Sequence, residues 1–219
     1  DWSHTESKPR APLLVNGNGY HGPVVKPVTD GDNQFHMQMS FRAPGYNTAE
    51  EVPLMVLTRV LDDGPNSLLQ RIVREDRALV YGITAGYTGY QDAGHFDIAT
   101  SVKADRLETV LATLTEVIQG LRDKGPSAAE MDGARLRHRY DLEFGRDSLS
   151  TWVDRYAWPL LYSHVRPEAE ELDQAGAVQA DQMRDLARQL LTRDRMHLAV
   201  VGPVDSKTED VLWKAVERW

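Results

Sequence analysis

The chain contains no cysteine. This absence excludes disulfide bonds, zinc sites built on thiolates and cysteine nucleophiles together. No apolar stretch approaches the roughly 18 residues that a membrane-spanning helix requires, so we expect no membrane span. The net charge of -8, without a basic stripe, argues against a nucleic-acid partner, because phosphate binding requires a local excess of Lys and Arg. A chain without cysteine is compatible with either the cytoplasm or the periplasm. The start at Asp1, without Met or a signal sequence, suggests a fragment or a processed product.

Histidine pairs with the spacing of a zinc motif are also missing. Zinc peptidases use two histidines on one helix face plus a carboxylate, and both His-Glu-x-x-His and its inverse are absent. A Gly-x-Ser-x-Gly elbow is absent as well. We therefore expect no cofactor in this chain and no hydrolysis by this chain alone. Zinc ligands drawn from distant histidines remain an alternative. The histidines are His4, His21, His36, His95, His138, His164 and His197.

The sequence divides into a lead-in and one domain. Residues 1–33 hold four prolines and several glycines, a composition typical of an extended linker. Residues 34–219 have an ordinary globular composition and a length that suits a single domain.

The order of hydrophobic patterns within the domain indicates its fold class. Residues 35–41 alternate apolar and polar side chains, as a half-buried strand does. Residues 79–87 and 94–102 predict the two strands of a hairpin. Helical patterns continue from there to about residue 191, and a strand at 196–201 precedes a C-terminal helix. Contiguous strands with helices clustered between them favour an α+β fold, with an antiparallel or mixed β-sheet and helices packed on one face.

Two helix starts carry the spacing of a capping box. Thr48 precedes Glu51 by three residues, and Ser127 precedes Glu130 by three. In this motif the hydroxyl accepts from the third backbone N–H of the helix, and the Glu side chain reaches back to the first residue. We expect a helix to begin at each site.

The segment from Ser67 to Tyr81, SLLQRIVREDRALVY, is the most distinctive part of the chain. It predicts a leucine-rich helix that ends in Arg74-Glu75, a short apolar turn, and a strand that bears Tyr81. It resembles the C-terminal, non-catalytic half of the pitrilysin-type (insulinase-like) zinc metallopeptidases, in which an arginine precedes a tyrosine by the same seven residues. An Asp-Ala-Gly-His-Phe hairpin, a Lys-Gly-Pro-Ser helix junction and a Leu-Ala-Val-Val-Gly-Pro strand follow in the family's order. The resemblance therefore covers nearly the whole chain from about residue 30 onward.

The resemblance implies one half of a clam-shell endopeptidase whose two halves enclose a chamber. Zinc is then expected on the partner half, which lies on the same polypeptide or on a separate subunit, and the expected substrate is a peptide. Tyr81 is implied to donate a hydrogen bond to the scissile carbonyl and to hold the oxyanion of the tetrahedral intermediate. Arg74 is implied to grip the substrate backbone as a fixed cation.

Plainer interpretations exist for both residues. Arg74 suits a helix end through the helix dipole, and Tyr81 is a common strand aromatic. Arg71 and Arg77 compete for the role of the arginine, and only the seven-residue spacing favours Arg74. A catalytically silent scaffold of the same fold and a stand-alone binding module of an unrelated α+β fold are the alternative functions.

Two other features bear on the comparison with the family. Ala78 occupies a place where family members often have glycine, which changes the turn and not the implied chemistry. Four aromatic residues are spaced like one helix face and its flank, and this pattern is more typical of core or subunit contact than of a ligand site. They are Trp152, Tyr156, Trp158 and Tyr162.

Overall fold

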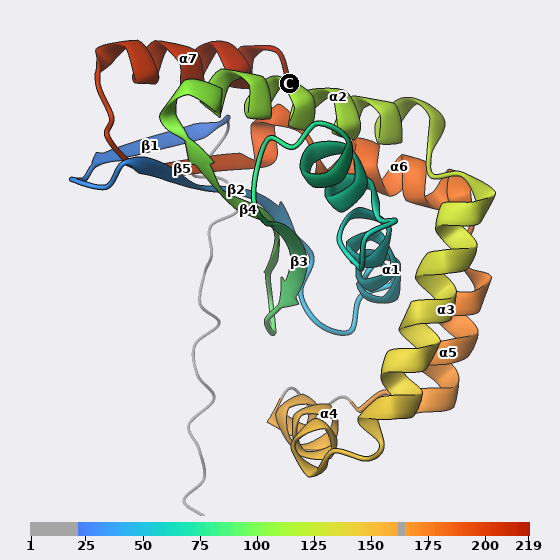
Figure 1. The fold of residues 1–219 in the computed structure, drawn as a ribbon. Coiled ribbons are helices and arrows are strands. Elements are labelled where there is room, and N and C mark those ends of the chain that lie inside the picture. The colour runs from blue at the N-terminus through green and yellow to red at the C-terminus, as the bar shows by residue number, and fades with distance from the viewer. Residues whose placement is uncertain (1–21, 162–164) are drawn as a thin grey trace, which may run out of the picture.

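The computed structural model describes residues 22–161 and 165–219, whose strands form one sheet (Figure 1). The strands are β1 (Val24–Thr29), β2 (Gln34–Ala43), β3 (Ile83–Gly89), β4 (Gly94–Lys103) and β5 (Met196–Gly202). Their order across the sheet is β1-β5-β2-β4-β3. The β1–β5 pair is parallel and the other three pairs are antiparallel. The sheet is therefore mixed, in agreement with the prediction.

Helices pack on one face of this sheet, and others extend away from it (Figure 1). They are α1 (Glu51–Leu61), α2 (Leu107–Lys124), α3 (Ala128–Gly145), α4 (Leu149–Leu161), α5 (Glu168–Ala177), α6 (Ala180–Leu190) and α7 (Ser206–Glu217). Shorter elements are the π-helix η1 (Gln70–Asp76) and the 3-10 turns η2 (Ala104–Arg106) and η3 (Arg193–Arg195). Figure 1 shows α2 and α7 along the sheet, with α3 and α5 running side by side away from it toward α4.

Alternation along the strands decides where the core lies. In β2 the buried side chains are Phe35, Met37, Met39 and Phe41, each no more than 2% exposed. His36 and Gln38, which lie between them, are exposed. Because successive side chains of a strand point to opposite faces, one face of the sheet packs on the helices and the other stays open. The predicted α+β class, with helices on one face, is confirmed.

The segment that was expected to be a linker contributes a strand. Val24–Thr29 pairs with β5 along its whole length, so the sheet begins before the expected boundary at residue 34. Pro27 and Lys26 suit this position, because β1 is an edge strand and both residue types are typical of sheet edges. The prolines argued against a helix in this segment, but they did not argue against an edge strand. Residues 1–21 of the predicted lead-in lie outside the described residues.

One of the two capping boxes forms. At α3 the Ser127 hydroxyl accepts from the backbone N–H of Glu130, whose carboxylate accepts from the backbone N–H of Ser127. The Thr48 hydroxyl instead donates to the carbonyl of Gly45. The carboxylate of Glu51 accepts from the Asn47 backbone N–H at 2.9 Å and is paired with Arg166 at 2.7 Å. The second box does not form, because α1 begins at Glu51 with Glu50 as its N-cap, so Glu51 is not the third residue of a helix capped by Thr48.

A buried charge network ties α3, α4 and α5 together. Oε2 of Glu171 on α5 accepts from Nη2 of Arg155 on α4 at 2.9 Å, and its Oε1 lies 3.1 Å from Nε2 of His138 on α3. Nε of Arg59 donates to Nδ1 of His138, and Nε2 of the same ring lies on the side of Glu171. Burial alone would raise the pKa of Glu171, but the contacts with His138 and Arg155 outweigh it and hold that pKa below its ordinary value.

The aromatic side chains of α4 are not part of the core. Trp152 and Trp158 are both exposed, and the rings of Trp152 and Tyr156 stack with their centroids 5.4 Å apart. The core interpretation of this set is therefore wrong for the two tryptophans, and subunit contact stays a prediction. Tyr162 lies outside the described residues.

Candidate functional site

The site predicted from the sequence is built on the turn that joins η1 to β3. The backbone N–H of Arg77 donates to the carbonyl of Ile72, and that of Leu79 donates to the carbonyl of Val73. Between them Ala78 has a φ of 45°, in the left-handed region. The helix therefore ends at a left-handed residue, a position that is usually glycine. The turn reverses the chain and directs residues 80–82 toward the sheet.

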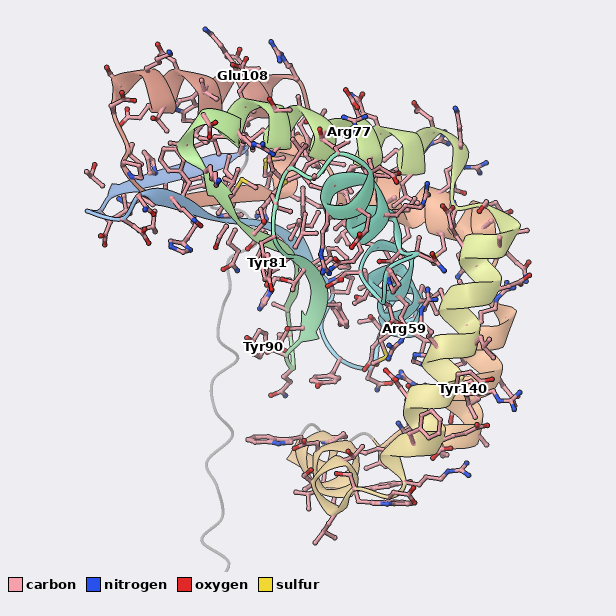
Figure 2. The ribbon with its side chains drawn as sticks, viewed as in Figure 1. Arg59, Arg77, Tyr81, Tyr90, Glu108 and Tyr140 are labelled. Carbon is pink, nitrogen blue, oxygen red and sulfur yellow. The ribbon has the colours of Figure 1, made fainter. Side chains whose placement is uncertain are left out.

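Tyr81 lies in the loop that follows this turn. The sequence predicted a strand from residue 79, but β3 begins at Ile83, so Tyr81 precedes the strand by two residues. Val80 is 8% exposed and anchors the loop in the core, whereas Tyr81 is 96% exposed. Figure 2 places Tyr81 beside the strands and Arg77 against α2. The strand interpretation of Tyr81 is therefore wrong, and its side chain is presented outward with no packing role.

Tyr81 borders a hollow on the open face of the sheet. A pocket of about 670 Å³ lies beside the loop, and its lining includes Tyr81, Ser101 and Lys103. A second hollow of about 600 Å³ adjoins it, because Gly82 and Ser101 line both. Small side chains, among them Ala99 and Ala199, form the floor of the second hollow. The two hollows together leave room for an extended chain across the strands.

Arg74 lies on η1, and its partners are neighbours on the same helix. Nη1 donates to Oε1 of Gln70 at 3.3 Å, and Nε lies 3.4 Å from Oε1 of Glu75. The two competing arginines are engaged over longer range. Arg71 pairs with Glu130 of α3, and Arg77 contacts residues of α2. Because both competitors hold helices together, Arg74 is the arginine of the three whose described contacts stay within its own segment.

The structure does not bring Arg74 and Tyr81 to one pocket. Tyr81 lines the first pocket and Arg74 lines neither hollow. The partner of Arg74, Gln70, lines the second hollow and donates from Nε2 to the carbonyl of Ile83 at 2.5 Å. The sequence brought Arg74 and Tyr81 into one segment but gave no sign of Gln70.

A second residue that sequence reasoning missed supports the edge of β3. Oδ2 of Asp62 accepts from the backbone N–H of Ala85 at 2.8 Å, and its Oδ1 accepts from Gln70. Two side chains thus satisfy backbone groups of an edge strand that would otherwise face solvent. No periodicity in the sequence marks Asp62 as a partner of β3.

The part of the chain that the structure describes contains no group of three or more His, Asp or Glu side chains placed to hold a metal ion. Within the same residues, no helix is both long enough and apolar enough to cross a bilayer.

The comparison with family models identifies the chain. Residues 1–137 match the model described as the peptidase M16 inactive domain. The chain belongs to the M16 peptidase family. The predicted pitrilysin-type, non-catalytic domain is confirmed, and the alternative of a binding module with an unrelated fold is wrong.

Curated relatives of this M16 inactive domain are named as uncharacterized zinc proteases. One from Mycobacterium tuberculosis is 28% identical over 201 residues, which is 91% of this chain and 46% of that protein. YmxG of Bacillus subtilis is 26% identical over 171 residues, which is 78% of this chain and 42% of that protein.

Solved structures agree on the fold. A protease from Helicobacter pylori matches 83% of this chain and 44% of its own with a TM-score of 0.78 and 16% identity. A peptidase M16 inactive domain from Pseudomonas fluorescens matches 84% of this chain and 44% of its own with a TM-score of 0.74 and 20% identity. The M16 inactive domain described here therefore spans less than half the length of these relatives.

Proposed function

We propose that this M16 inactive domain is the non-catalytic half of a zinc endopeptidase. It closes a chamber over a zinc-bearing half and supplies Arg74 and Tyr81 to a peptide held between the halves. Zinc is expected on that partner half, which is part of the same polypeptide or a second chain. The observation that carries the proposal is the position of Tyr81, a wholly exposed phenol on a turn fixed by backbone hydrogen bonds, at the rim of a pocket.

The chemistry of Tyr81 follows from that position. A phenol that stands out from the surface has its O–H free to donate to a group brought in by the other half. When the chamber closes, water leaves and the donor faces the carbonyl oxygen on which negative charge develops. A preorganised donor of this kind lowers the barrier by about 3 kcal/mol, or two to three powers of ten in rate. Tyr81 contributes no nucleophile, so its role is to stabilise charge.

Arg74 suits the binding of the substrate backbone. Its guanidinium stays charged and offers a planar fork of donors to peptide carbonyls. Its described partners, Gln70 and Glu75, lie on the same helix, so binding a substrate would not break a contact between helices. We therefore propose that Arg74 binds the substrate backbone and that Tyr81 stabilises the oxyanion.

Exposed apolar side chains on α3 and α4 support an assembly with a second half. Phe144 on α3 is 70% exposed, and on α4 Leu149 is 82% and Leu160 65% exposed. Apolar surface that gathers in this way is typical of an interface. The relatives are about twice as long as this chain, so we assign this surface to contact with the zinc-bearing half. Leu149→Glu is expected to weaken assembly, as measured by sedimentation of the two halves.

The experiment is a substitution in the assembled protein that contains the zinc-bearing half. Tyr81→Phe removes one hydroxyl and leaves the ring in place. We expect kcat for a quenched peptide to fall by at least about tenfold, with little change in the peptide's affinity. Tyr90→Phe is the matched control, because Tyr90 is also exposed and lies in the hairpin turn between β3 and β4, outside both hollows.

The outcomes separate the proposal from the alternative of a silent scaffold. Arg74→Gln is expected to raise KM more than it lowers kcat, because it removes binding common to substrate and transition state. If both variants assemble and cleave at the rate of the unaltered protein, the assigned roles are refuted and assembly alone remains.

A further inference from the structure

The pocket beside Tyr81 carries positive charge that the described part of the chain does not neutralise. Lys103 at the end of β4 and Arg106 in η2 both line it, and both are exposed. Its described lining includes no Asp or Glu. Within residues 22–161 and 165–219, neither cation forms an ion pair, although sixteen ion-pair contacts occur among those residues and the whole chain has a net charge of -8. Two unpaired cations in a hollow of an acidic protein favour an anionic ligand.

Arg106 is held in place by the turn that also presents Tyr81. Its Nη1 donates to the carbonyl of Ala78 at 2.6 Å. The other donors of the guanidinium have no partner among the described residues, and the planar fork fixes their directions once Nη1 is bound. A preorganised group binds a ligand at a smaller entropic cost than a free one. The carbonyl of the left-handed residue therefore orients a cation toward the pocket.

Lys103 and Ser101 extend the pocket along β4. Ser101 and Lys103 are two residues apart on the strand, so both side chains project from the same, open face of the sheet. Nζ of Lys103 has no hydrogen bond to any residue of the described chain. The hydroxyl of Ser101 lies 2.9 Å from Nδ1 of His36, and Gln34 faces Lys103 across the β2–β4 register. The uncharged polar side chains of Ser101 and Gln34 therefore lie beside Lys103 in the pocket lining.

We infer that this pocket is a subsite for a carboxylate of the peptide substrate. The carboxylate belongs either to an acidic side chain or to the C-terminus of the peptide, since both present the same two oxygens to Lys103 and Arg106. A carboxylate accepts from a guanidinium and an ammonium at once, and these charge-assisted hydrogen bonds are about twice as strong as neutral ones. The inference rests on the proposed function for the nature of the ligand, because the subsite lies next to Tyr81.

The experiment measures the affinity of labelled peptides for the assembled protein by fluorescence anisotropy. One set of C-terminally amidated peptides carries a single Glu at successive positions of a neutral sequence. A second set carries Gln at the same positions, and a third carries Gln with a free C-terminal carboxylate. We expect about tenfold tighter binding for Glu at one position, or for the free C-terminus, and a smaller preference as salt increases. The set that binds tightly identifies the source of the carboxylate.

Substitutions in the pocket test whether the preference for a peptide carboxylate arises there. Lys103→Gln together with Arg106→Gln is expected to abolish it, and Lys103→Gln alone to reduce it without disturbing the Ala78 turn. Lys207→Gln with Lys214→Gln is the matched control, because it removes the same charge from exposed positions on α7 that do not line the pocket. Equal affinities for all three peptide sets, or equal losses in the pocket variant and the α7 variant, would overturn the inference.

Failure of this inference is distinguishable from failure of the proposed function. Anisotropy measures binding and does not require cleavage, so a silent scaffold still gives a readable result. Tyr81→Phe is expected to slow cleavage of Glu and Gln peptides by the same factor, whereas the Lys103 and Arg106 variants change the ratio between them.

Discussion

The buried carboxylate of Glu171 gives the sharpest test of what holds α3, α4 and α5 together. Glu171→Ala removes the group that Arg155 of α4 and His138 of α3 both contact, and all three side chains are at most 16% exposed. Removing one member of a buried charge pair leaves the other charge without compensation, at a cost of 3–5 kcal/mol. Because Arg155 retains some solvent contact, we expect a loss of about 3 kcal/mol in the free energy of unfolding.

Glu168 supplies a matched control one helical turn away. It also lies on α5 and pairs with an arginine, but its partner Arg146 is 54% exposed. An ion pair open to solvent on one side contributes about 0–1 kcal/mol, so Glu168→Ala is expected to cost no more than that. Both variants are compared with the unaltered chain by urea denaturation followed by circular dichroism. The reasoning is refuted if Glu171→Ala costs no more than Glu168→Ala.

The same contacts predict a dependence on pH. The pKa of Glu171 is lowered in the folded chain, so its stabilising effect is complete above its ordinary value of 4.5 and is lost as pH falls through the lower folded value. The stability difference between the unaltered chain and Glu171→Gln is therefore expected to shrink as the pH falls below about 4.5. A difference that stays constant from neutral pH to pH 3 would contradict the assigned charge state.

Three further substitutions test local features of the site and the fold. Ala78→Gly relieves a left-handed backbone and is expected to raise the unfolding free energy by about 0.5 kcal/mol, and a loss of similar size would show that the turn is not strained. Asp62→Ala leaves the Ala85 N–H unpaired at the edge of β3, with an expected loss of about 1–3 kcal/mol and faster amide exchange at Ala85. Unchanged exchange there would count against edge protection. Ser127→Ala removes the hydroxyl of the capping box and is expected to cost about 1 kcal/mol by thermal unfolding. Full stability in that variant would mean that Glu130 alone caps α3.

Local patterns in the sequence were sufficient for the elements whose signals are short-range. Alternation in residues 35–41, the hairpin around residue 92 and the cap at Ser127 depend on neighbours along the chain, and each is found in the structure. The α+β class also followed from the order of these patterns. These features need only the propensities and periods of single segments. The family resemblance rests instead on the motifs between Ser67 and Pro203.

The tertiary structure alone decided the features that depend on distant partners. Glu51 pairs with Arg166, which lies far along the chain, and β1 joined the sheet because β5 offers a parallel edge. The cations beside Tyr81 come from β4 and from η2, and nothing in the spacing of Lys103 and Arg106 from Tyr81 marks them as neighbours. Local sequence determines which elements form, whereas the packing of those elements determines which side chains meet. Arg74 and Tyr81 could therefore be singled out from the sequence, whereas the pocket beside Tyr81 could be found only in the folded structure.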